Sequence, residues 1–381
     1  MSTPLRLAVV LTLLVTAGSA TAHPNHVETP KVTVHDDGTV TVEGIELPGQ
    51  NVAVPDDIAN IANRSERVLK AAEMLLEQLD DEQMTEAVLK LSADNAARWS
   101  NLPPPLGKRN GLRFDEMSAA QIEAACVMLK VAMGDETDNG YAEAMQLRMA
   151  DDVDALLPGR DERGFDYTSG AYTIAMLGKP SPDAAWMLQF GGHHLAINVT
   201  FKGGKIESFT PLHTGSEPII WKDGEQIYAP LADDHGAMVT LLAALNDEQT
   251  ATAKLDESFR DMLLGPGQDG QFPAGKQGIC VGDLNDEQKA LVLAAMRPWV
   301  MDANQDTAAE LLAVYQKELD ETYLAFSGTP TLSEHGDYVR LDGPSVWIEL
   351  SCQPTDMQPG HYHTVWRDRQ RDYGALFKFG D

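Results

Sequence analysis

The chain has 381 residues with 58 acidic and 29 basic side chains, which gives a formal net charge of −29 at pH 7. A negative field of this size repels nucleic acid and anionic lipid, so neither is expected as a partner. The length allows a large core without disulfides, and three cysteines permit at most one internal disulfide: Cys126, Cys280 and Cys352.

Residues 1–22 have the composition of a cleavable signal peptide. Arg6 precedes an apolar stretch from Leu7 to Val15, and small residues end in Ala20-Thr21-Ala22, the pattern after which signal peptidase cuts. The stretch is shorter than the ~20 residues of a membrane-spanning helix, and no later segment is longer or more apolar. The sequence therefore predicts a periplasmic or secreted protein, cleaved after Ala22, that does not span a membrane.

Residues 23–54 are expected to form an appendage ahead of the main domain. Between Lys31 and Leu47 valines alternate with polar residues around Asp37-Gly38, a dipeptide typical of a tight hairpin turn. We expect a short β-hairpin here.

Four predicted helix starts share one pattern, an acceptor at the N-cap with Gln three residues later. They are Asp80 with Gln83, Ser118 with Gln121, Asn246 with Gln249, and Asn285 with Gln288. Each pair of starts precedes a further amphipathic helix, near 139–157 and 306–325, and then a β-rich segment. We predict an α+β fold of two repeated halves, 55–228 and 229–381. Each half has capped helices followed by antiparallel strands, and the sheets meet near a pseudo-twofold in one compact domain.

The β segments of the two halves also align in sequence. Residues 186–198 match residues 338–349, which places Asn198 on Glu349, and further on His213-Thr214 falls on His363-Thr364. The alignment favours an internal duplication. The alternative is that capping boxes are common and strands resemble one another.

Histidines crowd into these β segments. His361 and His363 are two residues apart, so on a strand both would project from one face and could share a metal ion. Hydrogen bonds to nearby backbone are the alternative. His193 and His194 are consecutive, so both can serve one site only if the preceding glycines form a bulge or turn. A packed pseudo-twofold would bring the two segments together.

Glu349 lies in the apolar strand VWIEL, where a buried carboxylate needs a cation or hydrogen-bond donors. The predicted ligands of a transition metal are therefore His193, His194, His361, His363 and Glu349, with Glu217 as the second candidate for the carboxylate. Pairing of Glu349 with Arg340 or Arg367 is the alternative. Because the exported chain would meet its metal outside the cytoplasm, zinc or copper is expected.

A non-catalytic module that binds a small molecule or peptide is the second interpretation. Its pocket would include the histidines together with Trp186, Glu217 and Trp366, with Arg367 able to clamp a carboxylate in bidentate fashion. A structural clamp at Arg367 and a loop-capping role for Glu217 are the alternatives. The chain lacks the G-x-S-x-G, H-E-x-x-H and nucleotide-binding glycine patterns.

Three segments, GGHHLAIN, TPLHTGSEP and HYHTVWRDRQRDYG, resemble the domain of unknown function 3500 family. That family has a G-H-H-L segment and a C-terminal H-x-H-x-V-W-R-D followed by D-[YF]-G, and the resemblance covers roughly residues 57–381. It marks positions and implies no reaction, so no catalytic residue is carried over. His213 departs from the family pattern, whereas these residues match it: His193, His194, Glu217, His361, His363, Arg367, Asp368 and Asp372.

The leading hypothesis is a metal centre between the two halves. An ion with an open coordination position would allow metal-assisted hydrolysis or, with copper or iron, oxidation.

Overall fold

The computed structural model describes residues 30–36, 38–134, 139–353 and 360–379. The predicted signal peptide therefore lies outside the described residues. None of the helices in the described ranges combines the length and apolar composition that a membrane crossing needs.

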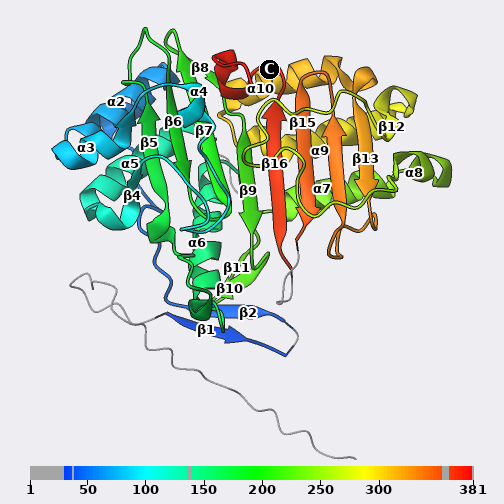
Figure 1. The fold of residues 1–381 in the computed structure, drawn as a ribbon, viewed down its shortest axis with the longest axis horizontal. Helices are drawn as coiled ribbons and strands as arrows, with labels where there is room; N and C mark the ends of the chain where they lie inside the picture. Colours follow the sequence, from blue (N-terminus) through cyan, green and yellow to red (C-terminus); the bar gives the residue numbers. More distant parts are fainter. Residues whose placement is uncertain (1–29, 37, 135–138, 354–359, 380–381) are drawn as a thin grey trace, which may run out of the picture.

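One large mixed sheet runs across the whole width of the molecule (Figure 1). It has 12 strands in the described part of the chain, and its pairs are antiparallel except for β3 with β5. Short strands β4 (Leu112–Arg113) and β8 (Lys205–Ser208) pair with β5 and β7. The other strands follow in this order: β12 (Ile279–Cys280), β13 (Tyr323–Ser327), β14 (Tyr338–Asp342), β15 (Val346–Cys352), β16 (Tyr362–Asp368), β9 (Leu212–Ser216), β7 (Leu195–Lys202), β6 (Trp186–Gly191), β5 (Thr173–Leu177) and β3 (Val88–Leu89).

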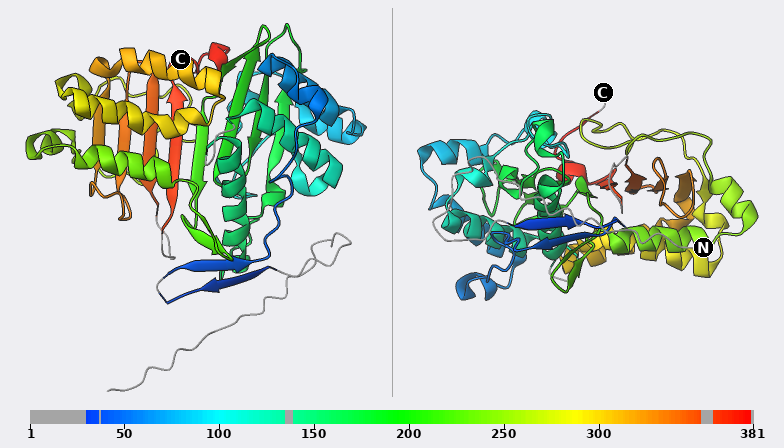
Figure 2. Two further views of the ribbon diagram at one scale, coloured as in Figure 1. Left: turned by 180° about the vertical axis from the view of Figure 1, so that it is seen from behind. Right: turned by 90° about the horizontal axis from the view of Figure 1, so that it is seen from below.

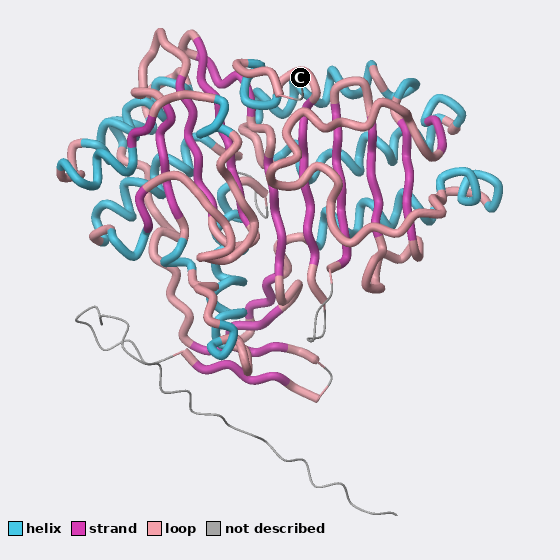
Figure 3. Tube along the Cα trace, in the orientation of Figure 1, coloured by secondary structure: helices cyan, strands magenta, loops and turns pink. Residues whose placement is uncertain are grey.

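The longer helices of both halves cover one face of this sheet, as the view from behind shows (Figure 2). Irregular loops run over the opposite face (Figure 3), and the colours of Figure 1 show that the segment 254–278 is one of them. The α+β class is therefore confirmed. The helices are α1 (Asp56–Ala59), α2 (Arg64–Leu76), α3 (Asp81–Ala87), α4 (Ala93–Ala96), α5 (Ala119–Ala132), α6 (Tyr141–Leu156), α7 (Ala232–Ala243), α8 (Asp247–Ala253), α9 (Asp286–Met301) and α10 (Gln305–Lys317). Short 3-10 helices are η1 (Phe114–Glu116), η2 (Asp161–Arg163), η3 (Ser169–Ala171), η4 (Val281–Asp283), η5 (Leu319–Glu321) and η6 (Asp372–Ala375).

All four predicted capping boxes are present, at the starts of α3, α5, α8 and α9. The two starts within each half also contact each other. The side-chain amides of Gln83 and Gln121 exchange hydrogen bonds, and those of Gln249 and Gln288 do the same. Each glutamine thus closes its own helix start and ties it to the other start of that half.

The strand ladders of the two halves follow the same register. Gln189 pairs with Ala175 and Asn198 in the first half, and Arg340 pairs with Ala325 and Glu349 in the second. The predicted match of Asn198 with Glu349 therefore agrees with the ladders. Internal duplication and the boundaries 55–228 and 229–381 stay predictions, which a superposition of residues 112–214 on 279–368 would test.

The predicted match of His213 with His363 is wrong by four residues. His213 pairs with Ala196 on β7. Because Asn198 matches Glu349, Ala196 matches Trp347 on β15, and Trp347 pairs with Arg367. The counterpart of His213 in the second half is therefore Arg367. Backbone pairing fixes the register of a strand, and a local sequence likeness cannot shift it.

The predicted N-terminal hairpin is present as β1 (Lys31–Val34) and β2 (Val40–Glu43), with Asp37 outside the described residues. It is part of a second sheet, because β2 pairs with β10 (Trp221–Asp223), which pairs with β11 (Gln226–Tyr228). Buried Val40 and Val42 anchor it to the core.

Candidate metal centre

His193 and His194 form the two-residue turn that joins β6 to β7. The Gly192 backbone N–H donates to the Leu195 carbonyl across this turn at 2.9 Å. His194 has φ of +63°, a left-handed conformation that is strained for a residue with a side chain. The two imidazoles lie with ring centroids 3.6 Å apart. The turn that the sequence required for both histidines to face one site is therefore present.

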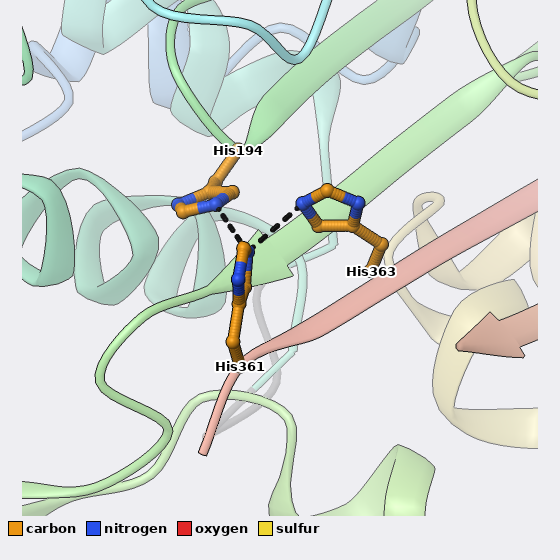
Figure 4. A group of neighbouring side chains, drawn as sticks. All are labelled: His194, His361 and His363. Atoms are coloured by element: carbon orange, nitrogen blue, oxygen red, sulfur yellow. Dashed lines mark hydrogen bonds between the residues drawn. The ribbon is translucent and has the colours of Figure 1, made fainter. Parts of the chain in front are cut away.

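His361 and His363 stand at the start of β16, and their Nε2 atoms are 3.0 Å apart. The Nε2 atom of His194 lies 2.9 Å from that of His361 (Figure 4). One ligand nitrogen of each of these three histidines lies within 4.8 Å of the others. His194 and His363 are buried, and the His361 side chain is 13% exposed.

Gly215 on β9 allows this convergence. A Cβ atom there would lie 3.0 Å from the Cδ2 atom of His194 and 3.1 Å from that of His363. Either contact is tighter than normal, so a side chain at this position would push the two rings apart.

A carboxylate lies behind each of the three converging imidazoles. Asp151 on α6 is 3.1 Å from His194 Nδ1, and Asp261 in the 254–278 loop is 3.1 Å from His363 Nδ1. Glu217, just after β9, is 3.6 Å from His361 Nδ1. Carboxylates at hydrogen-bond distance favour the tautomer with the proton on Nδ1, as in many metal sites, and this applies to His194 and His363, whereas Glu217 only faces His361.

The Nε2 atom of His361 lies close to the Nε2 atoms of both His194 and His363. With the protons of His194 and His363 on Nδ1, their Nε2 atoms have free lone pairs, and when His361 takes the same tautomer a cation between the three nitrogens is favourable. Two nitrogens on one tetrahedral zinc at ~2.0–2.1 Å would lie about 3.3–3.4 Å apart. Because the observed separations are 2.9 and 3.0 Å, the rings need to open only slightly to hold an ion.

Electrostatics around the cluster also favour a cation. Burial, and then the neighbouring imidazoles, hold the pKa values of His193 and His194 well below the ordinary range. Burial, together with Asp154 and Asp152, raises the pKa of Asp151. A bound cation would counter that rise.

Asp261 is the most exposed carboxylate of the group, with a side chain 44% exposed. Although burial raises its pKa, the hydrogen bond from His363 leaves the value below the usual range. The histidine cluster therefore lies nearest to solvent on the side of Asp261.

Sequence reasoning missed Asp151 and Asp261. Asp151 follows the buried Leu147 by one helical turn, and this spacing could have placed its carboxylate on the buried face of α6. Asp261 lies in an irregular loop, where no periodicity marks it.

The prediction of Glu349 as a metal ligand is corrected by its contacts. Its buried carboxylate accepts hydrogen bonds from the Leu263 and Leu264 amides, the Tyr338 hydroxyl and the Trp347 indole, at 2.6–2.8 Å. Four donors satisfy the carboxylate without a metal, so the donor alternative explains its burial.

Arg367 is also structural. It is fully buried and donates to the carbonyls of Leu264 and Gly265 and to the carboxylates of Asp269 and Asp372. These bonds use four of the five N–H groups, so the buried guanidinium has no pair of donors left for a bidentate ligand carboxylate.

Of the remaining predicted pocket residues, Trp186 and Trp366 are part of the core, and Glu217 lies near the histidines. Trp186 is buried at the first position of β6, at the opposite end of the strand from the His193–His194 turn. It stacks on Phe201 with ring centroids 4.1 Å apart. Trp366 is buried and donates to Tyr315. Glu217 alone lies near the histidines, where Arg160 donates to it at 2.8 Å. The pocket predicted from Trp186, Trp366 and Arg367 is therefore not formed.

His213 and the cysteines lie outside the converging group. The ring of His213 is buried, with its centroid 5.5 Å from that of His363, and burial lowers its pKa to about 3. Cys126, Cys280 and Cys352 are all free thiols.

A family model described as "Protein of unknown function (DUF3500)" matches residues 62–375. The chain belongs to this family. The match covers most of the chain, including the β6–β7 turn, Asp151, Asp261 and the start of β16 that together build the cluster. No curated protein and no solved structure matches the chain.

Proposed function

We propose that this family member is an exported metal-binding protein whose centre holds zinc or copper through His194, His361 and His363. Support for the proposal comes from the three Nε2 atoms at 2.9 and 3.0 Å, each with a carboxylate on the far side of its ring. Imidazole nitrogens are the ligands that zinc and copper share.

The chemistry of such a centre would follow from its open positions. Three protein ligands leave at least one coordination position for water or substrate, as in catalytic zinc sites. The ion would lower the pKa of bound water for hydrolysis, and copper would add oxidation. Export of the unfolded chain, with signal-peptide cleavage after Ala22, would leave folding and metal binding to the periplasm or the medium, where zinc and copper are the ions expected.

Elemental analysis of the secreted or periplasmic protein tests the proposal. The wild-type chain should carry at least one equivalent of zinc or copper, and the double variant His361→Ala/His363→Ala should lose it. His35→Ala is the matched control, because His35 lies exposed on the N-terminal hairpin and only bonds Thr41. Less than about a tenth of an equivalent of any metal in the wild type, before and after addition of zinc or copper, would reject the site.

A further inference from the structure

His193 stands beside the three converging histidines without joining them. Its Nδ1 atom lies 3.1 Å from Asp151 Oδ1, and the ring is turned so that no hydrogen bond forms. In the described part of the chain this buried Nδ1 atom has no hydrogen-bond partner. A nitrogen and a carboxylate oxygen this close, with no proton shared between them, repel each other unless a cation lies nearby.

His194 presents a nitrogen to each of two ligand groups. Its Nε2 atom faces His361, and its Nδ1 atom lies 3.1 Å from the same Asp151 oxygen that faces His193. Asp151, His193 and His194 form a second group with ligand atoms within 4.8 Å of one another. The two groups therefore share a single imidazole.

We propose that the cluster holds two transition-metal ions, the second bound by Asp151, His193 and the Nδ1 atom of His194. His194 then bridges the ions as an imidazolate. The second ion forms its bond to Nδ1 as the N–H bond breaks, and the proton leaves to solvent. One carboxylate oxygen with two imidazole nitrogens suits zinc or copper. This inference depends on the proposed function, because it adds a second ion to the same cluster.

Carboxylates and arginines both surround the second group. The carboxylates of Asp152 and Asp154 interact electrostatically with that of Asp151, and the carboxylate of Glu217 does so with that of Asp154. Arg160 is paired with Asp154 and Glu217 at 2.7 and 2.8 Å. Arg109, the other guanidinium near His193, is held by backbone carbonyls including that of Gly192. Arg148 and Arg163 also act on Asp152 and Asp154, so four arginines balance the four carboxylates, and the geometry of Asp151, His193 and His194 carries the case for a second ion.

Tyr172 holds the second group in place. Its hydroxyl donates to Asp151 Oδ2 at 2.6 Å and lies 2.7 Å from the His193 carbonyl oxygen. Gly192 permits this approach, because a Cβ atom there would lie 2.3 Å from the Tyr172 ring. The Oδ1 atom of Asp151 stays directed at the two histidines.

The test is a copper titration of the full metal-free chain, freed of metal by a chelator and then desalted. Copper sulfate is added stepwise, bound copper is measured after desalting, and an electron paramagnetic resonance spectrum is recorded at each step. We expect two copper ions per chain. The signal should grow with the first equivalent and fall with the second, because two copper(II) ions joined by an imidazolate couple antiferromagnetically.

His193→Gln removes a ligand of the second ion alone. The variant should bind one copper and keep its signal, whereas the control His35→Gln should behave as the wild type, with thermal melting used to verify folding. A wild-type chain that saturates at one copper would overturn this inference and leave the proposed function standing. No bound copper or zinc would overturn both. Two coppers with an undiminished signal, or two coppers in a folded His193→Gln variant, would overturn the bridge or the ligand assignment.

Discussion

Thr214 and Thr364 lie opposite each other on β9 and β16, the strands that join the two halves, with their hydroxyl oxygens 2.7 Å apart. The Trp299 indole N–H donates to Thr364 at 2.8 Å from α9. All three side chains are buried. The junction of the halves therefore contains a small polar network that only these partners satisfy.

Thr364→Val is expected to lower the free energy of unfolding by about 1–3 kcal/mol, because the Trp299 N–H loses its buried acceptor and Thr214 loses its partner. Urea denaturation measures this change. Thr364→Ser keeps the hydroxyl and should retain most of the stability. Equal losses in the Val and Ser variants would show that the methyl group matters and the hydrogen bonds do not.

Asp261→Ala is expected to weaken zinc binding about 10–100-fold, because His363 loses the carboxylate that orients its ring. Competition with a chromogenic chelator measures the affinity. The Asp261 side chain is nearly half exposed, so the fold should tolerate the change. Asp256→Ala, at an exposed position of the same loop, is the control. Indistinguishable affinities for the two variants would remove Asp261 from the site.

Asp234 on α7 gives the protein a pH-dependent stability. Burial raises its pKa to about 7, and neither oxygen accepts a hydrogen bond from another residue in the described ranges. Burial, and then the charge of Asp234, also raise the pKa of Asp302. Between the unfolded pKa of ~3.9 and the folded value the native chain retains a proton that the unfolded chain releases.

The stabilising contribution of Asp234 is therefore complete below about pH 4 and is lost as the pH rises to about 7, at a cost of about 2–4 kcal/mol. Asp234→Asn should flatten this decline and make the protein more stable than the wild type at pH 8. Urea denaturation from pH 4 to 8 in a chelator measures it, with exposed Asp233→Asn as control. Parallel curves for Asp234→Asn and the wild type would contradict the prediction.

Local features were readable from the sequence because neighbouring residues decide them. A capping box closes within three residues, so all four helix starts were predicted correctly. The two-residue spacing of His361 and His363 and the glycines before His193 were likewise enough to suggest histidines that face one site.

Only the tertiary structure decided which carboxylates join the histidines. Glu349 appeared to need a cation, but the 254–278 loop brings the Leu263 and Leu264 amides onto it from more than eighty residues away in the chain. The same loop carries Asp261 to His363, and α6 carries Asp151 to His194. Long-range contacts of this kind leave no periodic trace in the sequence, because they depend on how a loop and a helix pack against the finished sheet.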